Sequence, residues 1–159
     1  RQAEHYLARV HFFSLWREEG INGWTAKGLM KFHNTNKLFF LSRSPGAKRH
    51  LGRLIAAGFD TGEHADTVAL AYMTEAQKSL NVLTKSGPIA HTMERVLGKL
   101  SHNLSKSERQ ELLEVIQDFR QGLLPRSAPL TLLKHHVRRF NLDTPINQRF
   151  MPQYRSLLD

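Results

Sequence analysis

A histidine and a lysine lie one helical turn apart in a strongly apolar part of the sequence. His33 and Lys37 belong to the stretch "KFHNTNKLFFLSRSPGAKRHLGRL" and lie between Phe32 and Phe39. An imidazole can exchange a proton near neutral pH, and an ammonium group can bind an anion. On a helix, both side chains project from the middle of one apolar face. They could line a polar pocket that binds a phosphate or a base.

The same pair also has a structural interpretation. A histidine in a core can bond to a backbone carbonyl, and a lysine can extend its ammonium group to the edge of the domain. Burial of the lysine charge without a partner would be expensive. The residues alone are compatible with both the pocket and the core interpretation.

Basic side chains are concentrated in two segments that contain no acidic residue. One segment lies between Glu19 and Asp60, and the other lies between Asp118 and Asp143. Candidates for contact with phosphates are Lys27, Lys31, Arg43, Lys48, Arg49, Arg53, Arg120, Lys134, His135, Arg138 and Arg139. A solvated helix face also uses Lys and Arg, so no single position is informative. The combined pattern favours an anionic partner, because each cation that meets a phosphate releases condensed counterions.

Helical geometry arranges some of these cations in rows. Arg49 and Arg53 are one turn apart and point away from the apolar face of their predicted helix. Lys134 and Arg138 form a similar pair nearer the C-terminus. The sequence therefore predicts a phosphate-binding surface on three predicted helices, the second (residues 25–41), the third (45–58) and the seventh (130–140).

No motif indicates a particular enzyme class. The chain has no Cys, which excludes disulfides, thiolate metal sites and an iron–sulfur cluster held by its own residues. The adjacent His135 and His136 diverge by about 100° on a helix and make a poor metal pair. We find no glycine-rich phosphate loop, helix-turn-helix or zinc finger. No cofactor or metal is predicted.

The composition is that of a basic protein with enough apolar residues for a folded core. The chain has 159 residues, 40% of them hydrophobic, and a formal net charge of +9. This length fits one domain over residues 1–159. No apolar run approaches the roughly 18 residues of a membrane span, and no signal peptide is visible. We predict a cytoplasmic protein that does not bind membranes. The chain opens at Arg1 rather than Met, as an excised piece of a longer protein would.

Apolar residues recur at helical spacing along most of the chain, which predicts a single compact all-α domain of about seven helices. For the sixth helix, either Ser105 with Glu108 or Ser107 with Gln110 offers a capping box. The tail after residue 140 is expected to be irregular or a short helix. The predicted helices span residues 3–20, 25–41, 45–58, 64–84, 89–103, 105–122 and 130–140.

Two separated stretches resemble the YbgA-type domain, a bacterial domain of unknown function. They are "LMKFHNTNKLFFLSRSPGAKRHLGRLIA" and "ERQELLEVIQDFRQGLLPRSAPLTLLKHHVRRF", and "HFFSLWREEG" is similar to the family's entry helix. The matching positions in the two stretches are His33, Lys37, Ser44, Arg49, Leu51, Gly52, Arg120, Gly122, Pro125, Ala128, Pro129, Leu130 and His135. The middle stretch "IAHTMERVLGKLSHNL" departs from the family's pattern.

The resemblance implies a role in RNA binding. This family occurs alone and also fused after a thiouracil-desulfidase-like domain that holds an iron–sulfur cluster. Such fusions remove sulfur from 4-thiouridine in tRNA, and the YbgA-type part is expected to bind the tRNA. A desulfidase domain or protein, fused or separate, is the implied partner.

We therefore predict a helical domain that binds tRNA or another structured RNA and has no catalytic activity of its own. One alternative is an enzyme that acts on a phosphate-bearing small molecule, with His33 as acid or base and Lys37 as anion binder. A second alternative is a protein-interaction module that binds an acidic partner.

Overall fold

Residues 2–142, the part of the chain that the computed structural model describes, contain seven helices and no strand. The prediction of a single compact all-α domain is thus confirmed, while the predicted tail lies outside the described residues. In chain order the helices are α1 (Gln2–Glu19), α2 (Ala26–Arg43), α3 (Pro45–Asp60), α4 (Ala65–Leu80), α5 (Ser86–Leu100), α6 (Lys106–Gln121) and α7 (Ser127–Arg139).

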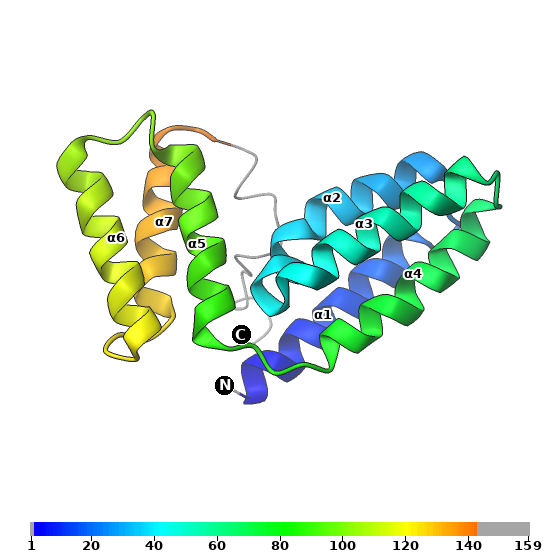
Figure 1. Ribbon diagram of the computed structural model, residues 1–159, viewed down its shortest axis with the longest axis horizontal. Coiled ribbons are helices and arrows are strands. Elements are labelled where there is room, and N and C mark those ends of the chain that lie inside the picture. The colour runs from blue at the N-terminus through cyan, green and yellow to red at the C-terminus, as the bar shows by residue number, and fades with distance from the viewer. Residues whose placement is uncertain (1, 143–159) are drawn as a thin grey trace.

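The helices form two neighbouring groups, α1 to α4 and α5 to α7 (Figure 1). Each group encloses its own cluster of buried apolar side chains. Helix α2 takes part in both clusters: Phe32 and Phe40 lie in the first, and Leu38 and Leu41 lie in the second. Because one helix fills both cores, α2 joins the two groups into one domain. The connected ends of α2 and α3 lie beside α5 (Figure 1).

Local signals in the sequence explain where several helices begin and end. Thr25 caps α2, and its hydroxyl accepts a hydrogen bond from the Gly28 N–H at 3.0 Å. Helix α6 has the capping box of Ser105 and Glu108, in which both reciprocal bonds are present. Gly122 ends α6 in the left-handed region, with φ of 81°, where glycine is favoured.

Two helices begin three residues earlier than the sequence predicts. Helix α5 starts at Ser86 instead of 89, and α7 starts at Ser127 instead of 130. In each case a proline, Pro88 or Pro129, occupies the first helical turn. Proline is tolerated there because the N–H groups of the first turn have no partner within the helix. The prolines thus belong to the helices rather than to the connections before them.

Candidate functional site

His33 lies between three helices of the first group. It projects from α2, its Nδ1 is 3.1 Å from the hydroxyl oxygen of Tyr72 on α4, and its side chain is only 6% exposed. On α3, Gly52 faces the ring: a Cβ built at that glycine would be 3.3 Å from His33 Nε2. The absence of a side chain at Gly52 therefore makes room for the imidazole.

The buried environment keeps His33 neutral. Burial, together with the charges of Lys48 and Lys37, lowers the pKa of His33 to about 4. Burial also raises the pKa of Tyr72 far above its ordinary value. The two side chains therefore share a hydrogen bond between neutral groups, and the tautomer of His33 decides which one donates. This geometry favours the core interpretation of His33 over a role as acid or base.

Lys37, one turn after His33, lies at the edge of a group of cations that we call the cation cluster. The cluster consists of Lys37 on α2, Lys48 on α3, and Arg95 and Lys99 on α5. Burial and the charges of Arg95, Lys37 and Arg49 lower the pKa of Lys48. Burial and the charges of Lys37, Arg95 and Lys48 lower the pKa of Lys99. Three helices thus bring four cations close enough to repel one another.

No carboxylate neutralises the cation cluster within residues 2–142, since none of its four members takes part in an ion pair there. Glu94 is next to Arg95 in the sequence, but its carboxylate is engaged by Arg120, whose Nη2 donates to Oε1 at 2.7 Å. The positive charge is therefore uncompensated by the described part of the chain.

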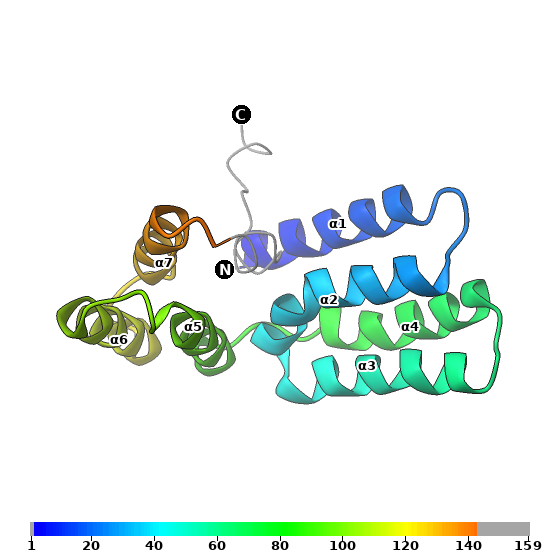
Figure 2. The same ribbon diagram turned by 90° about the horizontal axis from the view of Figure 1, so that it is seen from above.

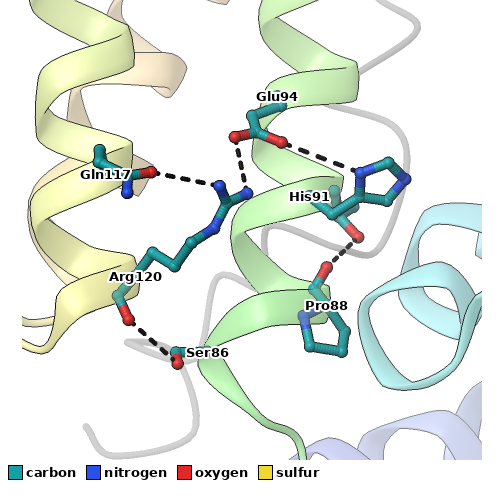
Figure 3. A network of polar contacts seen from close by, with 7 residues as sticks. Ser86, Pro88, His91, Glu94, Gln117 and Arg120 are labelled. Atoms are coloured by element: carbon teal, nitrogen blue, oxygen red, sulfur yellow. Dashed lines mark hydrogen bonds and ion pairs between the residues drawn. The ribbon is translucent and has the colours of Figure 1, made fainter.

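Arg120 belongs to a polar network that joins α5 to α6 (Figure 3). Besides Glu94, its guanidinium donates to Gln117 Oε1 at 3.2 Å, and its backbone carbonyl accepts from the Ser86 hydroxyl at 3.4 Å. His91 lies 3.9 Å from the other carboxylate oxygen of Glu94. The sequence predicts Arg120 as a phosphate contact, but the structure pairs its charge with a carboxylate.

Arg43 also differs from the prediction of a phosphate contact, because it is only 5% exposed. Its Nη1 donates to the Val82 carbonyl at 3.3 Å and lies 3.2 Å from His5 Nδ1. The guanidinium carbon lies 4.5 Å from the centre of the Phe39 ring. Helix α2 continues two residues beyond its predicted end, so Arg43 falls in the last helical turn and points inward.

The cations of α7 are separated from those of α3. Helix α7 lies on the side of the molecule that carries α1, and α3 lies on the opposite side (Figure 2). Arg139 forms an ion pair with Glu108, and half-buried Lys134 also interacts with other residues. Of the four basic residues predicted on α7, His135 and Arg138 are exposed and form no ion pair with the described residues.

The remaining predicted cations are exposed on α2 and α3. Arg49 and Arg53 point to solvent, opposite the buried Leu51 and Ile55 of the same helix. Lys27 and Lys31 are exposed in the first half of α2. Among the α2 and α3 cations, Lys37 and Lys48 interact electrostatically with cations of α5, whereas Lys27 and Lys31 lie toward the other end of α2.

Sequence reasoning missed Arg95 and Lys99. A signal for them exists: the two are one turn apart and exposed on a helix whose Met93, Val96 and Leu100 are buried. The signal is weak because Glu94 precedes Arg95, and the predicted surface is defined by long segments without acidic residues.

Neither a metal site nor a membrane-spanning helix is found among the described residues. Between residues 2 and 142, no group of three or more His, Asp or Glu side chains is placed to hold a metal ion. None of the helices there combines the length and apolar character needed to cross a membrane.

Comparison with known proteins agrees with the resemblance seen in the sequence. The family described as "Protein of unknown function (DUF1722)" matches residues 37–155. The Escherichia coli (strain K12) protein named "Uncharacterized protein YbgA" is 29% identical over 120 residues, which cover 73% of this chain and 68% of that protein. No solved structure matches. The chain belongs to the DUF1722 family of proteins of unknown function.

Proposed function

We propose that this domain binds structured RNA, with tRNA as the expected class, through a basic surface on α2, α3 and α5. The observation that carries the proposal is the uncompensated cation cluster. Lysines and arginines that displace counterions from phosphates supply most of the non-specific affinity for nucleic acids. The surface continues along α3, where Arg49 affects Lys48 electrostatically and exposed Arg53 follows one turn later.

Structured RNA suits this surface better than a DNA groove does. The cations come from three helices, and none of the helices described within residues 2–142 projects from the domain to enter a major groove (Figure 1). Folded RNA is recognised largely by its shape and its phosphates, which a rigid basic surface can contact. In this proposal the domain supplies binding, and a desulfidase domain or protein, fused or separate, acts on the bound tRNA.

The test is a measurement of tRNA affinity between 50 and 200 mM salt for three proteins. If about six to ten phosphates are contacted, wild-type affinity falls by about 10³ to 10⁵ over this range. Arg49→Glu/Arg53→Glu is expected to bind at least about tenfold more weakly at 50 mM salt. Lys106→Glu/Arg109→Glu makes the same change in net charge on exposed positions of α6, and it should lose severalfold less affinity than the α3 variant because it removes no phosphate contact.

Three results would contradict the proposal. One is no tRNA binding at 50 mM salt. Another is an Arg49→Glu/Arg53→Glu protein that binds like wild type. The last is an equal loss in the α6 control, which would show that net charge rather than this surface determines affinity. If the domain binds an acidic protein and does not bind tRNA, the result would support the alternative of a protein-interaction module.

A further inference from the structure

A cavity of about 500 Å³ lies at the turn between α1 and α2. Its wall includes the indoles of Trp16 and Trp24, whose ring centres are 4.2 Å apart. Both side chains are only half-buried, so part of each ring is accessible from the cavity. A pocket of this volume can hold a small organic molecule. The turn lies at the end of the first helix group that points away from α5 (Figure 2), so the cavity is separate from the cation cluster.

The two tryptophans are held in place by contacts with α4. The ring of Trp16 stacks on that of Tyr72, with the ring planes inclined by 11° and the centres 5.7 Å apart. The backbone N–H of Trp24 donates to Oδ1 of Asp66 at 2.7 Å. These contacts tie both residues to a packed helix, so the aromatic wall is formed before a ligand arrives. A preformed wall reduces the ordering cost of binding.

Polar groups from the last turns of α1 also line the cavity. Ser14, Arg17 and Glu18 are exposed there. Arg17 and Glu18 form no ion pair with the described residues, so the guanidinium can bind an anion and the carboxylate can accept a hydrogen bond. An aliphatic ligand would leave these groups unmatched, and an inorganic anion would make no use of the indoles.

Aromatic rings, a cation and a carboxylate together match the chemistry of a nucleotide. Its base packs against aromatic side chains, and its phosphate binds a guanidinium. The edge of the base forms hydrogen bonds, and a carboxylate there accepts from an exocyclic amino group. Adenine, cytosine and guanine carry such a group, whereas uracil does not. Glu18 therefore favours the first three bases over uracil.

We infer that the cavity between α1 and α2 binds a nucleotide whose base contacts Trp16 and Trp24. The exocyclic amino group of the base donates to Glu18, and the phosphate meets Arg17. This site goes beyond the proposed RNA surface and does not depend on it. A free nucleotide and an unpaired nucleotide of an RNA strand present the same chemistry to the cavity.

Tryptophan fluorescence reports directly on this site, because Trp16 and Trp24 are the two tryptophans of the chain. The whole chain is titrated with AMP, UMP and adenosine. Wild type should show a saturable change in tryptophan emission with AMP. UMP should bind more weakly, because uracil offers no amino group to Glu18. Adenosine should also bind more weakly, because it lacks the phosphate that meets Arg17.

Two variants separate the base contact from the phosphate contact. In Gly20→Ala the new Cβ would lie 2.5 Å from Nε1 of Trp24, so the indole must move, while both tryptophans remain for the measurement. This variant should bind AMP at least about fivefold more weakly. Gly98→Ala is the matched control, because its Cβ meets nothing within 4 Å, and it should bind like wild type. Arg17→Gln should weaken AMP severalfold and leave the affinity for adenosine unchanged.

The absence of a saturable response of wild type to AMP would overturn the inference. Equal AMP affinities of wild type, Gly20→Ala and Arg17→Gln would overturn it as well. Equal affinities of wild type for AMP and UMP would overturn the role of Glu18 in selecting the base.

Competition with tRNA identifies the source of the nucleotide. If the nucleotide belongs to RNA, AMP competes with tRNA, and Gly20→Ala weakens both ligands. If Gly20→Ala loses AMP but keeps wild-type affinity for tRNA, the site takes a free nucleotide. The Arg49→Glu/Arg53→Glu experiment decides the proposed RNA binding independently, whatever the result with AMP.

Discussion

At the scale of single residues, burial separates the roles of His33 and Lys37. The two side chains share a helix face, but the imidazole is enclosed by Tyr72 and Gly52, whereas Lys37 extends to the cation cluster. His33 therefore connects helices, and its neighbour one turn later contributes charge. The family resemblance places both residues in one signature, and the structure gives them different physical environments.

The first residue-scale prediction concerns the hydroxyl of Tyr72. Replacing Tyr72 with Phe leaves the Nδ1 of His33 buried without its partner, and this should lower the free energy of unfolding by about 1–2 kcal/mol. Urea denaturation measures the change. Tyr6→Phe is the matched control, because Tyr6 is 64% exposed and should have little effect. Equal stability of Tyr72→Phe and wild type would show that the hydrogen bond contributes nothing.

The second residue-scale prediction concerns pH. The pKa of His33 is lowered to about 4 in the folded state, from 6.5 in the unfolded chain. Between these values the unfolded chain binds a proton that the folded protein does not, so stability falls as pH decreases. The contribution of His33 approaches about 1.4 kcal/mol per pH unit within this window. It is absent well above pH 6.5, where both states are neutral.

Urea unfolding of wild type and His33→Gln from pH 7 to 4.5 isolates this contribution. Burial also lowers the pKa values of His5 and His136, but these groups are present in both proteins and cancel in the comparison. Wild type should lose more stability than the variant as pH falls. Parallel pH profiles would mean that His33 titrates normally.

At the scale of the elements, the capping box of α6 gives a prediction that distinguishes two alternatives in the sequence. The Ser105 hydroxyl accepts from the Glu108 N–H at 3.2 Å, and the Ser105 N–H donates to the Glu108 carboxylate at 2.8 Å. Ser105→Ala should lower the free energy of unfolding by about 1 kcal/mol. Ser107 lies inside the first turn and is exposed, so Ser107→Ala should be nearly neutral. Thermal or urea denaturation of both variants would decide, and the opposite order would contradict the assigned cap.

Sequence patterns predicted elements better than they predicted the site. Helical periodicity and capping residues identify all seven described helices because these signals are local. The predicted ends of helices are less accurate. Helix α2 extends two residues past its predicted end, and Arg43 is consequently buried. The pairing of Arg120 with Glu94 depends on how α5 packs against α6, and no spacing in the sequence encodes it. Arg95 and Lys99 join the cation cluster for the same reason, because α5 packs against α2.

At the scale of the whole molecule, the arrangement of the helices decides which cations can meet one ligand. The sequence predicts that α2, α3 and α7 share a surface, but α3 and α7 lie on opposite sides (Figure 2). Helix α5, rather than α7, packs against α2 and lies beside the connected ends of α2 and α3 (Figure 1). The positive charge that α7 offers to a ligand is also lower than the sequence suggests, because Arg139 forms an ion pair with Glu108.

This arrangement predicts unequal effects of two matched charge reversals on tRNA binding. Arg53→Glu changes an exposed cation on α3, and Arg138→Glu changes an exposed cation on α7. Both variants alter the net charge equally, so long-range attraction weakens to the same degree. If RNA binds to the proposed surface of α2, α3 and α5, only Arg53→Glu removes a phosphate contact, so it should lower affinity severalfold more than Arg138→Glu and reduce the salt slope by about one unit. Fluorescence anisotropy across a salt series measures both quantities.

A larger loss of affinity in Arg138→Glu would place the RNA on the α7 side of the molecule. That result, or equal losses in the two variants, would contradict the surface formed by α2, α3 and α5.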